Sequence, residues 1–161
     1  KPLGTANAVL AAENFVEDEL FLMVNSDNLY PVEDLRKLRN LNSTGLIAYN
    51  KKSLIEKSNI TAEKINKFAV MSFDDEDYLL KVIEKPEKVE ENAFISMSAF
   101  VFSPKIFAAC RSINLSPRGE YELADAINFA VGNLGEKFKA IYSNEGVLDL
   151  SSRADIAGIA E

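Results

Sequence analysis

The chain has 161 residues, of which 47% are hydrophobic and 27% are charged, and its formal net charge is −7. These values are ordinary for one globular domain, and the acidic balance argues against a protein that binds nucleic acid through its phosphates. Histidine is absent, which excludes Ser-His-Asp catalysis, Cys-His catalysis and zinc held by histidine. The lone Cys110 excludes an internal disulfide and fits a reducing compartment, so we expect a cytoplasmic protein. No apolar run has the length of a membrane span, and we expect no membrane partner.

The first residues predict a loop that leads into a helix. Thr5 is a good N-cap, and the residues from Ala6 to about Val16 are mostly helix formers with one apolar side. Lys1 is not an initiator methionine, so we expect this chain to be a piece of a longer protein.

The stretch from Phe21 to Asn28 is the segment on which the functional interpretation depends. Four apolar residues at 21–24 predict a strand that is buried on both faces, and a polar cluster with one acid, Asp27, follows it. In an open α/β sheet, ligands bind beyond the carboxyl ends of such strands. Asp27 therefore predicts either a ligand for a hard cation or a cap for the next helix, and the residues alone favour neither.

Beyond Asn28, apolar periodicity and turn residues predict alternating helices and strands. Pro31 suits the first position of one helix, and Gly135 suits the end of another. The four acids at 74–77 join two strand-like runs and predict a hairpin with a solvated turn. The expected elements, in chain order, are helix 31–39, strand 45–49, an irregular stretch 51–67 with a helical turn at 62–66, strands 68–73, 78–84 and 94–102, helices 103–113 and 120–134, strand 138–142, an apolar run at 146–150 and helix 154–160.

This alternation predicts an α/β fold with a mostly parallel mixed sheet and helices on both faces. The hairpin at 68–84 is the expected antiparallel part of that sheet. Cys110 lies on the apolar side of its helix, which predicts a buried core thiol rather than a nucleophile.

Charged residues follow three of the apolar runs. Asp27 and Asp149 each end one run, and if both runs lie in one sheet, the two carboxylates can converge on one Mg²⁺. Glu84 and Lys85 end another strand and offer an acceptor and a cation to a phosphorylated ligand. The residues alone favour a solvated surface lysine for Lys85, and they leave Asp149 open between a metal ligand and a helix cap.

Six short motifs follow one another along the chain. They occupy 2–6 (PLGTA), 25–28 (NSDN), 84–86 (EKP), 95–102 (ISMSAFVF), 118–125 (RGEYELAD) and 148–149 (LD). Each motif alone is weak, but in this order and spacing they resemble the sugar-1-phosphate nucleotidyltransferases, or nucleotide-sugar pyrophosphorylases. The resemblance implies a Rossmann-like nucleotidyltransferase fold. It also implies transfer of a nucleotidyl group from a nucleoside triphosphate to a sugar 1-phosphate, with release of pyrophosphate.

The resemblance implies roles for residues near the metal and the nucleotide. Asp27, with a catalytic role, and Asp149 match the family's two metal ligands, and Mg²⁺ is the implied cofactor. Gly4 and Thr5 match the loop that meets the nucleobase, where glycine lets the backbone come close. Uridylyl, guanylyl, thymidylyl and cytidylyl transfer all fit these motifs.

A second group of residues is implied in sugar-phosphate recognition. Lys85 matches the catalytic cation for the sugar phosphate, and Glu84 matches the acid that takes sugar hydroxyls. Ser96 stands where many members carry a sugar-contacting asparagine. Glu120 and Tyr121 lie near the sugar pocket by the same analogy.

One feature of the family has no counterpart in this sequence. Members begin with a glycine-rich loop that carries an arginine and wraps the triphosphate, and no such segment occurs here. By analogy, residues 1–161 cover roughly the C-terminal two-thirds of a catalytic domain, and we expect the chain to be inactive alone. We also expect an exposed sheet edge or apolar face, which favours a homo-oligomer.

Two other functions compete with this interpretation. The first is a non-catalytic regulatory module of the same fold that binds sugar or nucleotide, and the presence of Asp27, Lys85 and Asp149 argues against it. The second is a metal-dependent glycosyltransferase, a class that often uses an Asp-X-Asp motif. Here Asn28 and Leu29 follow Asp27, which disfavours that function.

Overall fold

The centre of the fold is β6 (Phe94–Phe102), a long strand with partners on both edges. In this computed structural model, which describes residues 3–151 and 155, β3 (Gly45–Asn50) pairs along one edge of β6. β1 (Phe21–Met23) and β4 (Ala69–Phe73) share the other edge. The sheet is completed by two outer strands: β5 (Leu79–Ile83) beside β4 and β7 (Lys139–Ser143) beside β3.

The α/β class and the mixed sheet with helices on both faces are confirmed, but the expectation of mostly parallel pairing is wrong. Among the described strands of this sheet, only β3 and β7 pair in parallel. β6 is antiparallel to β1, β3 and β4, and β5 is antiparallel to β4. The reason is that β6 follows the β4–β5 hairpin and then lies between strands that all run the other way. A pattern of alternating helices and strands does not show where a later strand inserts.

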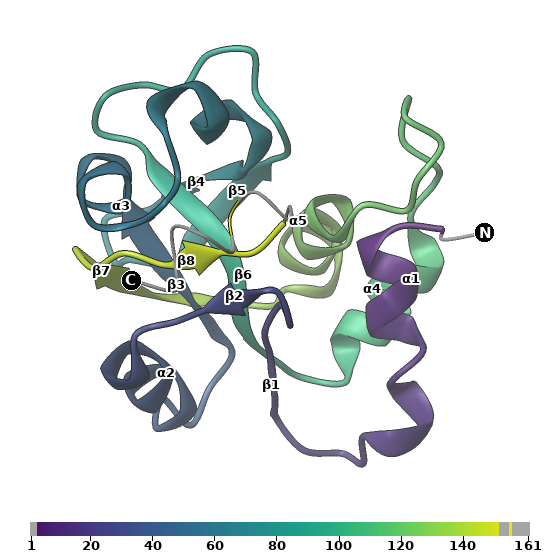
Figure 1. The fold of residues 1–161 in the computed structure, drawn as a ribbon. Helices are drawn as coiled ribbons and strands as arrows, with labels where there is room; N and C mark the ends of the chain where they lie inside the picture. Colours follow the sequence, from purple (N-terminus) through teal and green to yellow (C-terminus); the bar gives the residue numbers. More distant parts are fainter. Residues whose placement is uncertain (1–2, 152–154, 156–161) are drawn as a thin grey trace.

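Alternation along β6 divides the core into two layers, one on each side of the sheet (Figure 1). The buried even-numbered aromatic residues of β6 share a core with the first group of helices, and the odd-numbered residues share a core with the second group. The first group is α1 (Thr5–Leu10), α4 (Lys105–Ser112) and α5 (Leu123–Leu134). The second group is α2 (Val32–Arg39), α3 (Lys51–Lys57) and the 3-10 helix η2 (Ala62–Lys67).

The N-terminal helix is shorter than its composition predicts. α1 ends at Leu10 and is followed by the 3-10 helix η1 (Glu13–Phe15), so the expected helix to Val16 is wrong in length. The Ala12 amide bonds the Val9 carbonyl, which tightens the chain out of the α-helical path. Thr5 is the first helical residue of α1 and does not cap it.

The apolar run at 21–24 does not form a strand buried on both faces. Among the described strands β1 pairs with β6 alone, and Leu22 and Val24 are 41% and 39% exposed. An apolar strand is buried on both faces only when other elements cover both of them. β1 is therefore an exposed apolar sheet edge, as expected for this chain.

The segment 51–67 contains more regular structure than its composition predicts. α3 begins after Asn50, whose side-chain oxygen accepts a hydrogen bond from the Ser53 amide (3.1 Å). Asparagine is a strong N-cap, so Asn50 was the available signal for this helix. η2 agrees with the expected helical turn at 62–66.

Other local expectations are confirmed. The hairpin joins β4 and β5, and Gly135 ends α5 with a left-handed φ of 64°. Cys110 is buried in the core, and burial raises the pKa of its thiol to about 11. The helix expected at 154–160 falls outside the described residues, apart from position 155. No helix in the described part of the chain has the length and apolar character needed to cross a membrane.

A second, two-stranded sheet lies beside the first. It is formed by β2 (Asn28–Leu29) and β8 (Leu148–Asp149), which are antiparallel. Figure 1 shows the two strands side by side, although they come from opposite parts of the sequence.

Candidate functional site

A gap between two strands on one edge of β6 contributes to a pocket. β1 pairs with Phe100–Phe102 and β4 with Phe94–Ser96, so no described strand pairs with residues 97–99 on that edge. The register between β6 and β3 also shifts at this point. A cavity of about 670 Å³ lies here, a volume typical of small-molecule sites.

The pocket brings together predicted site residues from distant parts of the chain. Those that line it are Thr5, Glu84, Lys85, Ser96 and Glu120. Asn25 and Ser26, in the loop after β1, also line it, and Asp27 follows them directly. Neither Asp27 nor Asp149 is part of the pocket wall itself.

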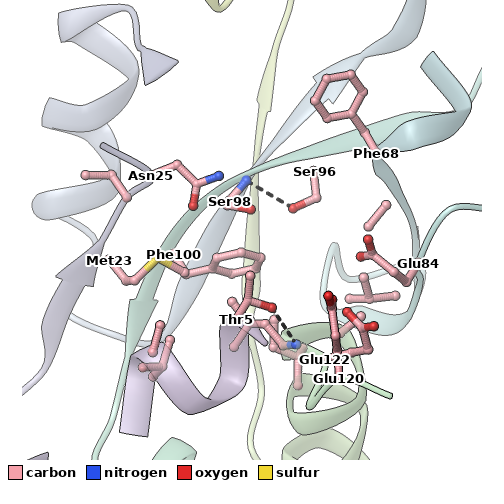
Figure 2. A pocket seen from close by; sticks show the side chains of 18 of the residues that line it. Thr5, Met23, Asn25, Phe68, Glu84, Ser96, Ser98, Phe100, Glu120 and Glu122 are labelled. Atoms are coloured by element: carbon pink, nitrogen blue, oxygen red, sulfur yellow. Dashed lines mark hydrogen bonds between the residues drawn. The ribbon is translucent and has the colours of Figure 1, made fainter. Parts of the chain in front are cut away.

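Two serines interrupt the aromatic side of β6 and make this part of the pocket polar. Ser96 and Ser98 occupy positions that alternate with Phe94, Phe100 and Phe102 on the same side of the strand. The Ser98 amide donates a hydrogen bond to Ser96 Oγ (3.3 Å; Figure 2). The Ser96 hydroxyl hydrogen has no acceptor among the described residues, so it is available to a ligand. The interrupted aromatic pattern is also the sequence signal for Ser98.

Ser98 has a left-handed backbone conformation, with φ of 57°. A side chain in this conformation costs roughly 1–2 kcal/mol because Cβ crowds the backbone. Ser98→Gly is therefore expected to raise the free energy of unfolding by up to about 1 kcal/mol, after the higher entropy of glycine in the unfolded chain is subtracted. Urea denaturation measures this gain, and Ser96→Gly, at an ordinary strand position, is expected to lose stability. A loss of stability in Ser98→Gly would contradict the assignment of strain to this residue.

Charged side chains form one end of the pocket. Arg118 pairs with Glu122 (2.6 Å) and with Glu84 (3.5 Å), so it connects the loop before α5 to the end of β5. The pKa of the Glu84 carboxyl lies above its ordinary value, mainly because the group is buried. The charge of Arg118 lowers this pKa, and the charge of Glu122 raises it. Figure 2 shows Glu84, Glu120 and Glu122 gathered in this region. The motif at 118–125 contains Arg118, but the sequence gives no sign that Glu84 is its partner.

Lys85 is exposed at the edge of the pocket, and its backbone is also left-handed, with φ of 44°. Its ammonium group forms no hydrogen bond or salt bridge within the described part of the chain. A lysine that lines a pocket and forms no salt bridge can bind an anionic ligand group.

Thr5 and Gly4 connect the start of α1 to the start of α5. Thr5 Oγ1 accepts a hydrogen bond from the Leu123 amide in the first turn of α5 (3.0 Å; Figure 2). Gly4 has φ of 111°, and a Cβ at this position would lie 2.5 Å from the Tyr121 carbonyl oxygen. The Tyr121 amide donates to the Leu3 carbonyl (2.8 Å). Close contact between two backbone segments therefore explains this glycine, and neither Gly4 nor Tyr121 is a pocket-lining residue.

Asp149 lies in the small sheet of β2 and β8, and Asp27 is the turn residue directly before β2. Asn28 lies opposite Asp149 in this sheet, and the Leu150 amide donates to the Asp27 carbonyl (2.8 Å). Asp27 does not cap the next helix, because Pro31 is the N-cap of α2 and no side-chain cap is present. The alternative interpretation of Asp27 as a cap is therefore wrong.

The two carboxylates suit a hard divalent cation. Asp149 is 7% exposed, and its Oδ2 accepts a hydrogen bond from the Ser151 hydroxyl (2.6 Å). Asp27 is exposed, and its carboxylate forms no hydrogen bond or salt bridge with any described residue. Within the described residues, no group of three or more His, Cys, Asp or Glu side chains is placed to hold a metal ion. Mg²⁺ commonly takes one or two carboxylates and completes its shell with water and phosphate oxygens, so the chemistry of these two acids fits it.

Known proteins share the sequence pattern of this chain. The family model described as nucleotidyl transferase matches residues 1–149. A bifunctional protein GlmU of Methanocaldococcus jannaschii is 32% identical over 141 residues, which are 88% of this chain and 30% of that protein. A UTP–glucose-1-phosphate uridylyltransferase, AglF, of Haloferax volcanii is 26% identical over 156 residues, covering 94% of this chain and 59% of that protein. The chain thus spans only part of the length of either relative.

Solved structures share the fold. A UDP-glucose pyrophosphorylase complexed with UDP-glucose matches with a TM-score of 0.73 at 16% identity, covering 99% of this chain and 63% of that chain. An inositol-1-phosphate CTP transferase from T. maritima matches with a TM-score of 0.68 at 20% identity, covering 95% and 58%. At these identities the likeness is one of architecture.

Proposed function

The chain belongs to the nucleotidyl transferase family, and we propose that the full-length protein transfers a nucleotidyl group from a nucleoside triphosphate to a sugar 1-phosphate, giving a nucleotide-sugar and pyrophosphate. One observation carries the proposal: the turn that ends at Asp27 leads into the strand paired with that of Asp149, and the loop before Asp27 lines a pocket that also contains Glu84, Lys85 and Ser96. The enzyme interpretation is preferred to a binding module because both acids and Lys85 are present, and none of the three forms a salt bridge with a described residue.

The reaction forms one phosphorus–oxygen bond and breaks another. A phosphate oxygen of the sugar 1-phosphate attacks the α-phosphorus, and the bond to the oxygen that bridges to the β-phosphate breaks, so pyrophosphate leaves with the electron pair. The attacking phosphate is already largely ionised near neutral pH, so no general base is needed and the lack of histidine is no obstacle. The protein contributes orientation and neutralisation of charge.

Residues beside the reacting phosphates would supply that neutralisation. Asp27 and Asp149 would hold Mg²⁺, which when bound offsets negative charge on the phosphates. Lys85 places an ammonium at the sugar phosphate. Glu84 accepts hydrogen bonds from sugar hydroxyls, and the Ser96 hydroxyl donates to the sugar.

Other residues complete the proposed site. Thr5 Oγ1 already accepts the Leu123 amide, so its hydroxyl hydrogen is left for an acceptor on the nucleotide. Gly4 shapes the same loop, Glu120 stands beside the sugar, and Tyr121, which does not line the pocket, supports that loop through its backbone contact with Leu3. The phosphorylated substrates favour a cytoplasmic location, and the exposed apolar edge of β1 favours self-association as a homo-oligomer.

The proposal is tested by incubating the full-length protein with Mg²⁺, each nucleoside triphosphate and a panel of sugar 1-phosphates, and measuring pyrophosphate release. In the same assay, Lys85→Ala is expected to raise the KM for sugar 1-phosphate by about tenfold to a hundredfold, with a smaller change for the triphosphate, because one charge-assisted contact is lost. Lys88→Ala removes an exposed lysine that pairs with Glu90 outside the pocket, and it is the matched control.

Pyrophosphate release from no pair of substrates would overturn the proposed function. Equal increases in KM for both substrates in Lys85→Ala would remove Lys85 from the sugar-phosphate site and leave the reaction class intact.

A further inference from the structure

The loop that carries Asp27 closes around a buried tyrosine hydroxyl. Tyr30 is 7% exposed, and its Oη accepts hydrogen bonds from the Asn25 amide and from Asn28 Nδ2, both at 3.2 Å. Asn25 and Asn28 stand on either side of Asp27 in the sequence. One hydroxyl therefore holds both ends of the short segment that presents this carboxylate.

The same hydroxyl connects that segment to the sheet. Tyr30 Oη donates to the Met97 carbonyl (2.5 Å), and Asn28 Nδ2 also reaches this carbonyl (3.3 Å). Residues 97–99 of β6 lie where β1 and β4 leave the edge unpaired and where the register with β3 shifts. Backbone groups inside a protein need partners, and the Tyr30 hydroxyl and the Asn28 side-chain amide both donate to this carbonyl. Tyr30 therefore joins the irregular centre of β6 to the Asp27 segment.

A neutral side chain holds the second acid in a similar way. The Asp149 amide donates to Asn59 Oδ1 (2.8 Å), and Asn59 Nδ2 donates to the Asp149 carbonyl (2.7 Å). Both bonds go to the backbone, so Asn59 leaves the Asp149 carboxylate untouched. A lysine or arginine in either place would instead compete with a metal ion for the carboxylate oxygens.

We propose that Tyr30 and Asn59 are positioning residues that fix the backbones of Asp27 and Asp149 so that both carboxylates can reach one divalent cation. This inference rests on the proposed function, because it assigns the two acids to a metal site. Groups that orient metal ligands without touching the metal commonly change its affinity by tenfold to a hundredfold when they are removed.

The test compares two buried tyrosines in the same core. Tyr49 is fully buried beside Tyr30, and its hydroxyl has no hydrogen-bond partner within the described residues. Mn²⁺ is titrated into the 161-residue chain, and its paramagnetic broadening of the amide resonances of residues 25–29 and 148–150 gives the affinity. Tyr30→Phe is expected to weaken Mn²⁺ binding about tenfold or more, whereas Tyr49→Phe leaves it unchanged.

Amide hydrogen exchange separates positioning from a general loss of stability. In Tyr30→Phe the Asn25 amide loses its acceptor, so its exchange is expected to accelerate while amides in the centre of β3 keep their protection. Uniform acceleration throughout the sheet with unchanged Mn²⁺ affinity would identify a merely structural tyrosine and overturn the inference. If Tyr30→Phe does not fold, the same Mn²⁺ titration of Asn59→Ala tests the role of Asn59 in positioning Asp149. An unchanged Mn²⁺ affinity of Asn59→Ala would overturn the inference.

The two proposals fail in different ways. If the wild-type chain shows no Mn²⁺ broadening at residues 25–29 and 148–150, the metal site fails and the positioning roles fail with it. If the wild type binds and Tyr30→Phe binds equally well, the positioning role alone is overturned.

Discussion

Asp27→Asn is expected to reduce Mg²⁺-dependent turnover of the full-length protein by at least about a hundredfold. The substitution keeps the size of the side chain but replaces a charged oxygen ligand with a neutral amide, which binds a hard cation less tightly. The fold is expected to tolerate the change, because the Asp27 side chain is exposed and forms no hydrogen bond or salt bridge within the described residues. Activity and stability should therefore separate in this variant.

The measurement is turnover over a range of Mg²⁺ concentrations, together with a thermal unfolding curve for each variant. Asp75→Asn is the matched control, because Asp75 is an exposed acid in the turn between β4 and β5, away from the pocket. Wild-type turnover in Asp27→Asn would refute the role given to this residue. If the unfolding temperature and the turnover of Asp27→Asn both fall greatly, Asp27 supports the fold instead.

Gly4→Ala is expected to lower the free energy of unfolding by about 3 kcal/mol or more. The backbone at Gly4 has φ of 111° and ψ of 171°, a region that residues with a Cβ rarely adopt. The added methyl would lie 2.5 Å from the Tyr121 carbonyl oxygen and 2.7 Å from its nitrogen, so two backbone segments would have to separate. This separation would also weaken the hydrogen bond between Thr5 and the first turn of α5.

Denaturant unfolding of the 161-residue chain measures this loss, and Gly132→Ala supplies the control. Gly132 lies in α5, and a methyl group added there would meet no atom within 4 Å beyond its own stretch of helix, so alanine is expected to add about 0.5–1 kcal/mol through helix propensity. Opposite signs for the two substitutions would support the close approach of Gly4 and Tyr121. Equal stability of Gly4→Ala and the wild type would contradict it.

Elements with local signals could be predicted from the sequence. The hairpin turn forms where expected because the Asp74 carboxylate accepts hydrogen bonds from the Glu76 and Tyr78 amides, all within a few residues. α5 follows its apolar spacing and ends at the glycine that tolerates a left-handed conformation. These interactions join near neighbours, so their pattern is visible in the chain itself.

Elements whose outcome depends on distant partners could not be predicted in the same way. The apolar composition of β1 indicated burial, but burial depends on which elements cover a strand, and β1 has one strand neighbour in the described structure. The antiparallel insertion of β6 depends on pairing with strands from three separate parts of the chain. No local periodicity in the sequence indicates which strands β6 pairs with.

The sequence by itself determined the α/β class, the family resemblance and the identity of the candidate acids, because motifs and periodicity are local properties. Only the tertiary structure decided that Asp27 precedes a strand paired with that of Asp149, that Arg118 joins Glu84 to Glu122, and that Tyr30 and Asn59 hold the acid-bearing segments. Each of these depends on hydrogen bonds, strand pairing or ion pairs between residues that folding brings together. Contacts of that kind leave no pattern along the chain.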